Sequence, residues 1–151
     1  MKTAVVTGGT RGIGAALVKA FLASGWNVAY SGTSRETIEK SFELFRGEFP
    51  EDRYSAFPCE VSSEADLISL WEGAVSTFGS VDIWVNNAGT SSDQTPFHEL
   101  PAGIFTRIID TNVKGLMLAT HLAYNRMLKQ GHGAIYNMEG LGSDEIGRAH
   151  V

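Results

Sequence analysis

The stretch Thr7-Gly8-Gly9-Thr10-Arg11-Gly12-Ile13-Gly14 separates an apolar segment, residues 2–6, from residues 15–22, which have the apolar spacing of a helix. A glycine turn between a strand and a helix leaves free backbone N–H groups at the positively polarised start of the helix. A pyrophosphate group binds well there, because glycines let it approach the backbone closely. The stretch therefore predicts a strand, a phosphate-binding turn and a helix.

The composition limits the possible classes of function. The sequence has 151 residues, 43% of them apolar, which suffices for one buried core and hence one domain. Its net charge of −5 disfavours a nucleic-acid partner, which needs a basic surface. The single cysteine, Cys59, excludes an internal disulfide. No apolar run is long enough to span a membrane, so we expect a soluble, cytoplasmic protein.

Strand-like and helix-like segments alternate along the chain. We expect strands at 2–6, 27–31, 53–57, 81–85 and 134–138, and helices from Ala15 to Leu22, Ser34 to Arg46, Ser63 to Gly79 and Pro101 to Lys129. Five alternations without an internal repeat predict an α/β fold, a Rossmann-type doubly wound parallel sheet. The fifth strand lies near the end of the sequence, so we expect this sheet to be incomplete at its C-terminal side.

Several motifs together resemble the short-chain dehydrogenase/reductase family. Glycines 8, 12 and 14 have the spacing of that family, whereas many other dehydrogenases carry Gly-x-Gly-x-x-Gly. Asn86-Asn87-Ala88-Gly89 follows the fourth expected strand, Asp110-Thr111-Asn112-Val113-Lys114-Gly115 lies in the long helix, and 133–138 resembles the strand before the catalytic serine. The resemblance covers residues 1–143. It implies that residues 1–144 form the dinucleotide-binding domain of a truncated enzyme of this family.

The resemblance assigns the cofactor site to the turns that follow the first four strands. The implied cofactor-binding residues are Gly8, Thr10, Arg11, Gly12, Ile13, Gly14, Arg35, Glu60, Val61, Asn87, Ala88 and Gly89. Glu60 stands where the family usually has an aspartate near the adenine. Asn86 and Asn87 would shape the site and would transfer no proton.

Residues around the second strand favour NADP(H) over NAD(H). NAD-binding enzymes place an acidic residue at the end of this strand to bond the ribose hydroxyls, but Gly32 stands there. Arg11 and Arg35 could bind a 2′-phosphate through their guanidinium groups. Either arginine alone would equally suit a solvated surface. The pair, together with the missing acid, indicates NADP(H).

The catalytic residues of the resembled family are only partly present. The family uses a tyrosine as general acid/base, and a lysine four residues later lowers its pKa toward neutral pH. None of the tyrosines, which are Tyr30, Tyr54, Tyr124 and Tyr136, has a lysine four positions later. We expect that pair beyond this sequence, so the 151 residues alone would bind a dinucleotide weakly and turn nothing over.

Two catalytic residues are implied by a closer resemblance to the chlorophyll b reductase branch of the family. Asn112 would support a proton relay through water, and Ser143 would hold the substrate oxygen. The serine usually stands three residues after Asn137, where this chain has Gly140. A polar loop can also contain a serine without a catalytic role. Asn112 can bond the backbone at a helix kink, which does not exclude the relay.

The implied function is an oxidoreductase that transfers a hydride between NADP(H) and a small-molecule carbonyl or secondary alcohol, with the formyl group of a tetrapyrrole as one specific substrate. The alternative is a non-catalytic dinucleotide-binding sensor, which would keep the glycine turn and lack the tyrosine and lysine. The Asn-Asn-Ala-Gly motif disfavours a third class, the extended epimerases. We expect no metal, because His98, His121 and His132 show no ligand spacing.

The stretch from Pro101 to Lys129 carries more apolar residues than one core-facing stripe needs. By the resemblance, this helix would pack against its copy in a homo-oligomer of the full-length protein. Deeper burial in a monomer is the alternative.

The final residues resemble no part of the family pattern. Ile146-Gly147-Arg148-Ala149-His150-Val151 is the in-frame translation of a common sequencing adapter. We interpret residues 145–151 as a non-native tail and leave them out of the fold prediction.

Overall fold

The computed structural model describes residues 1–92 and 95–139, which contain a five-stranded sheet. The strands are β1 (Thr3–Val6), β2 (Asn27–Gly32), β3 (Tyr54–Pro58), β4 (Ile83–Asn86) and β5 (Ala134–Asn137). They lie in the order β3-β2-β1-β4-β5, and every neighbouring pair is parallel. This order is that of a Rossmann-type sheet, as the sequence predicts.

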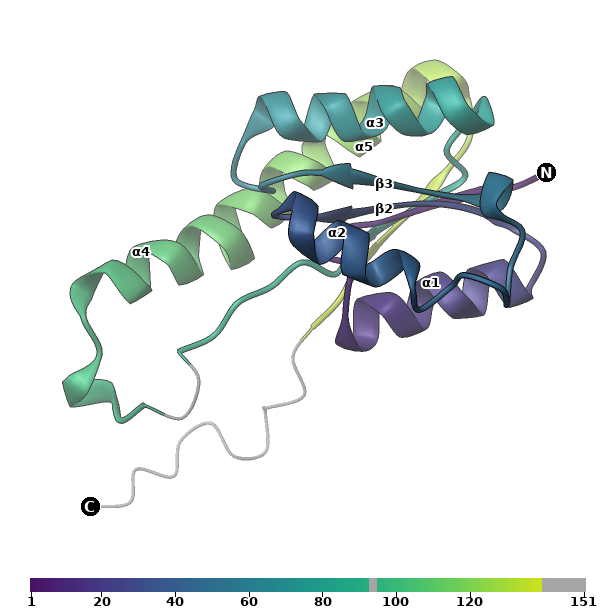
Figure 1. Cartoon of the computed structure of the whole chain (residues 1–151). Coiled ribbons are helices and arrows are strands. Elements are labelled where there is room, and N and C mark those ends of the chain that lie inside the picture. The colour runs from purple at the N-terminus through teal and green to yellow at the C-terminus, as the bar shows by residue number, and fades with distance from the viewer. Residues whose placement is uncertain (93–94, 140–151) are drawn as a thin grey trace.

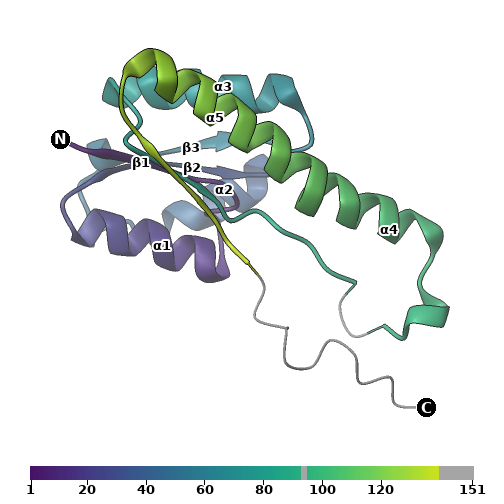
Figure 2. The same ribbon diagram turned by 180° about the vertical axis from the view of Figure 1, so that it is seen from behind.

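Helices cover both faces of the sheet. They are α1 (Gly12–Ala23), α2 (Arg35–Phe42), α3 (Glu64–Phe78), α4 (Ala102–Ile109) and α5 (Leu116–Gln130), with a π-helical segment η3 (Asp110–Gly115) and short 3₁₀ turns η1 (Glu51–Arg53) and η2 (Phe97–Glu99). α1 and α2 lie on one face, and α3 and α5 lie on the other (Figures 1 and 2). The sheet is therefore doubly wound.

The strands are apolar on both sides because both sides are covered. Val5, Ala29 and Trp84 belong to the core under α3 and α5. Their chain neighbours Val6, Tyr30 and Val85 belong to the core under α1 and α2. Alternation along β1, β2 and β4 thus supplies two cores from a single sheet.

The helix that begins after Ser34 is shorter than the sequence predicts. Ser34 caps it as expected, because its Oγ accepts a hydrogen bond from Thr37 N, but α2 ends at Phe42 rather than at Arg46. Phe45 is fully buried, and its ring lies 5.5 Å from the Tyr30 ring and 5.6 Å from the Tyr54 ring. Packing of this ring into the core replaces the last helical turn.

The predicted long helix consists of α4, η3 and α5 in succession. α4 extends past the carboxyl ends of the strands (Figures 1 and 2), and none of its residues is buried. α5 turns one face to the core through Ala119, Ala123 and Met127. A second apolar stripe along the same rod is exposed, and it consists of Phe105, Ile109, Val113, Met117, Tyr124 and Leu128. Within the described ranges, no helix is long and apolar enough to cross a membrane.

Candidate cofactor site

The glycine turn leads from β1 into α1 and is bonded to the end of β2. Gly8 has φ +66° and Gly12 has φ +54°, values that favour glycine. Gly8 N donates to Ser31 Oγ at 3.2 Å, and Gly9 N donates to Ser31 O at 2.8 Å. The turn and β2 therefore form one connected unit.

The third glycine of the motif allows close packing of α1 on the sheet. A Cβ atom on Gly14 would overlap the Gly8 carbonyl oxygen and lie 2.6 Å from Asn87 Nδ2. A Cβ atom on Gly12, in contrast, would meet no atom within 4 Å. Gly14 is thus required by packing, while Gly12 faces open space.

The motif after β4 is hydrogen-bonded to the glycine turn. Asn87 Nδ2 donates to Thr7 O at 2.9 Å and to Gly8 O at 3.1 Å. Thr7 Oγ1 accepts from Asn87 N and from Ala88 N, each at 3.0 Å. Two segments some eighty residues apart are thereby held as one wall.

Asn86 lies on the other side of this wall. Its Nδ2 donates to Thr120 Oγ1 at 2.9 Å and to Asn137 Oδ1 at 2.8 Å, and its Oδ1 accepts from Trp84 Nε1 at 2.7 Å. Asn86 therefore joins β4 to β5 and α5, and it does not line the cavity described next.

A cavity of about 780 Å³ lies at the carboxyl ends of the strands. Eleven of the twelve predicted cofactor-binding residues line it: Gly8, Thr10, Arg11, Gly12, Ile13, Gly14, Glu60, Val61, Asn87, Ala88 and Gly89. The twelfth, Arg35, begins α2 and is exposed outside the lining. The volume lies in the range of small-molecule and cofactor sites.

Gly32, which the cofactor argument places at the ribose, also lines this cavity. Six further lining residues were missed by sequence reasoning: Ser31, Thr33, Cys59, Thr90, Arg107 and Thr111. Thr90 could have been predicted from sequence, because it directly follows the Asn-Asn-Ala-Gly motif. Arg107 was harder to predict, because it lies on α4, far along the chain from the turns. Its Nη2 donates to Ser91 O at 3.4 Å.

Of the two predicted catalytic residues, one lies within the described part of the chain. Asn112 lies on the π-helical segment η3, where its side-chain amide is hydrogen-bonded to the backbone of Thr90. It is exposed and stands beside the cavity without lining it. Ser143 and the segment 145–151 lie outside the described residues.

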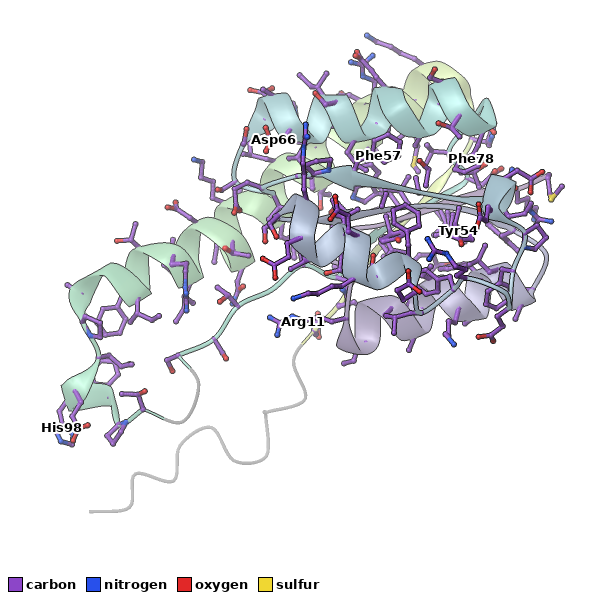
Figure 3. All side chains as sticks on the ribbon, in the orientation of Figure 1. Arg11, Tyr54, Phe57, Asp66, Phe78 and His98 are labelled. Carbon is purple, nitrogen blue, oxygen red and sulfur yellow. The ribbon has the colours of Figure 1, made fainter. Side chains whose placement is uncertain are left out.

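The start of α1 suits an anion. Arg11 is the N-cap residue and makes no side-chain cap bond, and the first turn carries no acidic residue. The first N–H groups of a helix lack partners inside it. Figure 3 shows Arg11 at this end of α1. Among the described residues, neither Arg11 nor Arg35 forms an ion pair. The open space at Gly12 and the N–H groups of the first turn of α1 fit a pyrophosphate.

Two buried hydroxyl groups and the thiol of Cys59, which lines the cavity, are held neutral. Burial raises the pKa of Tyr30 to about 12, although its hydroxyl is hydrogen-bonded to Ser41 Oγ at 2.9 Å. Burial also raises the pKa of Tyr54. Burial, and then the carboxylates of Asp66 and Glu60, raise the pKa of Cys59 to about 12. None of these groups suits proton transfer near neutral pH.

A second cavity, of about 410 Å³, lies at the end of α5 beside β5. It is lined by Tyr124, Met127, Leu128, Gly131, His132, Gly133 and Ile135, and contains no predicted site residue. In the part of the chain that the structure describes, no group of three or more His, Cys, Asp or Glu side chains could hold a metal ion.

The strand order, the glycine turn before α1 and the cavity at the carboxyl ends of the strands define a Rossmann-type α/β protein. The family model described as short chain dehydrogenase matches residues 2–147. The chain therefore belongs to the short-chain dehydrogenase family.

Relatives of two kinds have the same identity to this chain. It is 36% identical over 136 residues to a 3alpha-hydroxysteroid dehydrogenase of Mediterraneibacter gnavus. This match covers 90% of this chain and 54% of that protein. It is also 36% identical over 142 residues to the chloroplastic chlorophyll(ide) b reductase NOL of Oryza sativa subsp. japonica, covering 93% of this chain and 41% of that protein. The chain thus spans about half the length of these relatives.

Solved structures share the fold. The structure of ElxO with NADP bound has a TM-score of 0.83 and 28% identity, and the match covers 95% of this chain and 57% of that one. A 3-oxoacyl-reductase structure from Bacillus thuringiensis has a TM-score of 0.80 and 26% identity, covering 95% and 59% of the two chains.

Proposed function

We propose that the chain is the NADP(H)-binding part of an oxidoreductase that transfers a hydride between the nicotinamide and a carbonyl or secondary alcohol. The observation that carries this proposal is the cavity over the start of α1, lined by eleven of the residues assigned to the cofactor from sequence. Membership of the short-chain dehydrogenase family supports the reaction class.

Charge and shape at the end of β2 support NADP(H) over NAD(H). Gly32 supplies no carboxylate to repel a 2′-phosphate, and Arg11 lines the cavity with its guanidinium free of ion pairs to described residues. Arg35 lies outside the lining, so we assign it a smaller part. The fold neighbour ElxO has been solved with NADP bound.

Each element of the site has a distinct task in this proposal. The bound nicotinamide would supply or accept the hydride. Gly12, Ile13 and the start of α1 would bind the pyrophosphate, and Ala88 and Gly89 would let the adenosine side pass close to the backbone. Asn112 would hold the Thr90 segment and support a proton relay, and Ser143 would bond the substrate oxygen.

The substrate is proposed as a class. The relatives of equal identity are named for a hydroxysteroid and for chlorophyll(ide) b, so the resemblance alone favours neither. A formyl group on a tetrapyrrole stays one specific candidate within the carbonyl class. The cytoplasmic location likewise stays a prediction from sequence, and the plant relative is named as chloroplastic.

A non-catalytic dinucleotide sensor is the second candidate. Such a sensor would need only the glycine turn and its cavity, which the described residues supply. Both candidates bind the dinucleotide, so activity separates them. NADPH oxidation by the full-length gene product with a panel of aldehydes and ketones would support the enzyme, and nucleotide binding without turnover would support the sensor.

Fluorescence titration of the chain with NADPH and NADH tests the cofactor proposal. We expect saturable binding of both, with NADPH at least about tenfold tighter, a difference near 1.4 kcal/mol. Equal affinities would contradict the NADP(H) preference. Binding of neither nucleotide would contradict the proposed function as a whole.

We further propose that the full-length protein is a homo-oligomer. The exposed stripe from Phe105 to Leu128 runs along the whole α4–η3–α5 rod. An exposed apolar stripe of this length is typical of a surface that another protein surface covers. A second copy would cover it symmetrically.

A further inference from the structure

The end of β2 is closed to any side chain at position 32. A Cβ atom on Gly32 would lie 2.5 Å from Thr10 Cγ2, and 3.2 Å from both Ile38 Cγ1 and Thr37 Oγ1. Two carbon atoms pack best at about 3.5–4.0 Å. A side chain at position 32 therefore requires Thr10 to move.

Thr10 has little freedom to move away. Its neighbour Gly9 donates a hydrogen bond to Ser31 O at 2.8 Å, and Gly8 N bonds Ser31 Oγ. A Cβ atom on Gly9 would itself lie 2.6 Å from Tyr30 Cβ, so the turn already packs tightly on β2. Threonine is also restricted at χ1 because it is β-branched. The backbone that carries the Thr10 side chain is thus held against the end of β2.

We propose that Thr10 is a specificity-determining residue for the cofactor. Its methyl group occupies the space that an acidic side chain at the end of β2 would need, and so keeps this wall of the cavity free of a carboxylate. This inference rests on the proposed NADP(H) function. Thr10, Gly32 and Arg11 line the same cavity, so a 2′-phosphate beside the Arg11 guanidinium meets no carboxylate from the end of β2.

The cofactor preference then depends on Thr10 and Gly32 together rather than on position 32 alone. Gly32→Asp introduces the carboxylate that would bond the ribose hydroxyls of NAD(H), but it collides with the Thr10 methyl group. Thr10→Ser removes only that methyl group and keeps the hydroxyl. Thr10→Val keeps a methyl group and removes the hydroxyl, which makes it the matched control.

The nucleotide test compares G32D, T10S/G32D and T10V/G32D with the unmodified chain, each titrated with NADH and NADPH. We expect T10S/G32D to bind NADH at least about tenfold more tightly than either G32D or T10V/G32D does. Equal NADH affinities in the three folded variants would overturn the proposal, as would a full gain in G32D alone.

The stability test needs no nucleotide. We expect G32A to lower the melting temperature by about 3 °C, and T10S/G32A to regain most of this loss. Purely additive effects of the two substitutions would overturn the proposed contact. If the unmodified chain bound neither nucleotide, the proposed function would fail, while this cycle would still decide whether Thr10 blocks position 32.

Discussion

The side-chain amide of Asn112 is paired with the backbone of Thr90. Asn112 Oδ1 accepts from Thr90 N at 2.9 Å, and Asn112 Nδ2 donates to Thr90 O at 2.8 Å. Thr90 lines the cavity and Asn112 does not. Asn112, on the π-helical segment η3, therefore holds a residue of the cavity wall in place without lining the cavity itself. This pairing gives Asn112 a task that is independent of any proton relay.

Replacing Asn112 by Ala should loosen the Thr90 segment. Both hydrogen bonds are lost, and each is worth about 0.5–1.5 kcal/mol or less at an exposed position. We expect faster hydrogen exchange at the Thr90 amide and a several-fold loss of nucleotide affinity. Asn112→Asp keeps the acceptor for Thr90 N and loses the donor, so its effect should be intermediate. Unchanged exchange at Thr90 in N112A would contradict the pairing.

Replacing Gly14 by Ala should be strongly destabilising. The added methyl group would overlap Gly8 O and crowd Asn87 Nδ2, and overpacking of this kind costs about 1–3 kcal/mol or more. Gly103→Ala is the matched control, because a Cβ there meets no atom within 4 Å and lies in a helix. G103A should raise the free energy of unfolding by about 0.5–1 kcal/mol. Urea unfolding measures both, and equal effects would contradict the packing role of Gly14.

Replacing Arg11 by Gln should weaken NADPH binding selectively. The neutral amide cannot pair with a phosphate dianion, so we expect a loss of about tenfold for NADPH and little change for NADH. Arg46→Gln, an exposed arginine beside Glu43 and Glu51, is the control and should alter neither affinity. A larger loss in R35Q than in R11Q would show that Arg35, which lies outside the cavity lining, is the main 2′-phosphate ligand.

Stability should fall in alkaline solution. Burial raises the pKa of Cys59 from 9.0 and that of Tyr30 from 10.0, each to about 12. Between the unfolded and folded pKa values, the folded state retains protons that the unfolded state releases, so stability decreases as pH rises through that window. Cys59→Ser lacks the thiol and should flatten the decrease. Urea unfolding from about pH 8 to about pH 10.5 measures the slope, and the same slope in both proteins would argue against a buried neutral thiol.

A charge in the exposed stripe should dissociate the proposed oligomer. Met117 lies within the stripe and is 64% exposed, so Met117→Glu would bury a carboxylate in the interface at a cost of several kcal/mol. Light scattering of the full-length protein should give the monomer mass for M117E. Ser76→Glu, at an exposed position of α3, should keep the oligomer mass. An unmodified protein that is already monomeric would contradict the proposal.

The elements whose signals are local were predicted well from sequence. All five strands and the Ser34 and Ser63 caps follow from apolar runs and capping residues. The early end of α2 was not predictable, because it depends on where Phe45 packs against Tyr30 and Tyr54. Local periodicity does not contain that tertiary contact.

In the cofactor site, too, residues of contiguous motifs were predicted from sequence and contacts between distant segments were not. The glycine turn and the Asn-Asn-Ala-Gly motif are contiguous in sequence, and their members line one cavity. Arg107 and Thr111 reach the cavity only because α4 and η3 pass over it, and the contact between Thr10 and Gly32 arises from the pairing of a turn with a strand end. Contacts between distant segments are set by the fold, so sequence patterns alone could not name them.

The most direct test of the central claim is an amide NMR titration of the isotope-labelled chain with NADP⁺. We expect the amides of Gly12, Ile13 and Ala88, which belong to cavity-lining residues, to shift in a saturable manner. The amides of His132 and Gly133, at the second cavity, should not change. Shifts confined to the second cavity, or no shifts at all, would contradict the assignment of the glycine-turn cavity as the dinucleotide site.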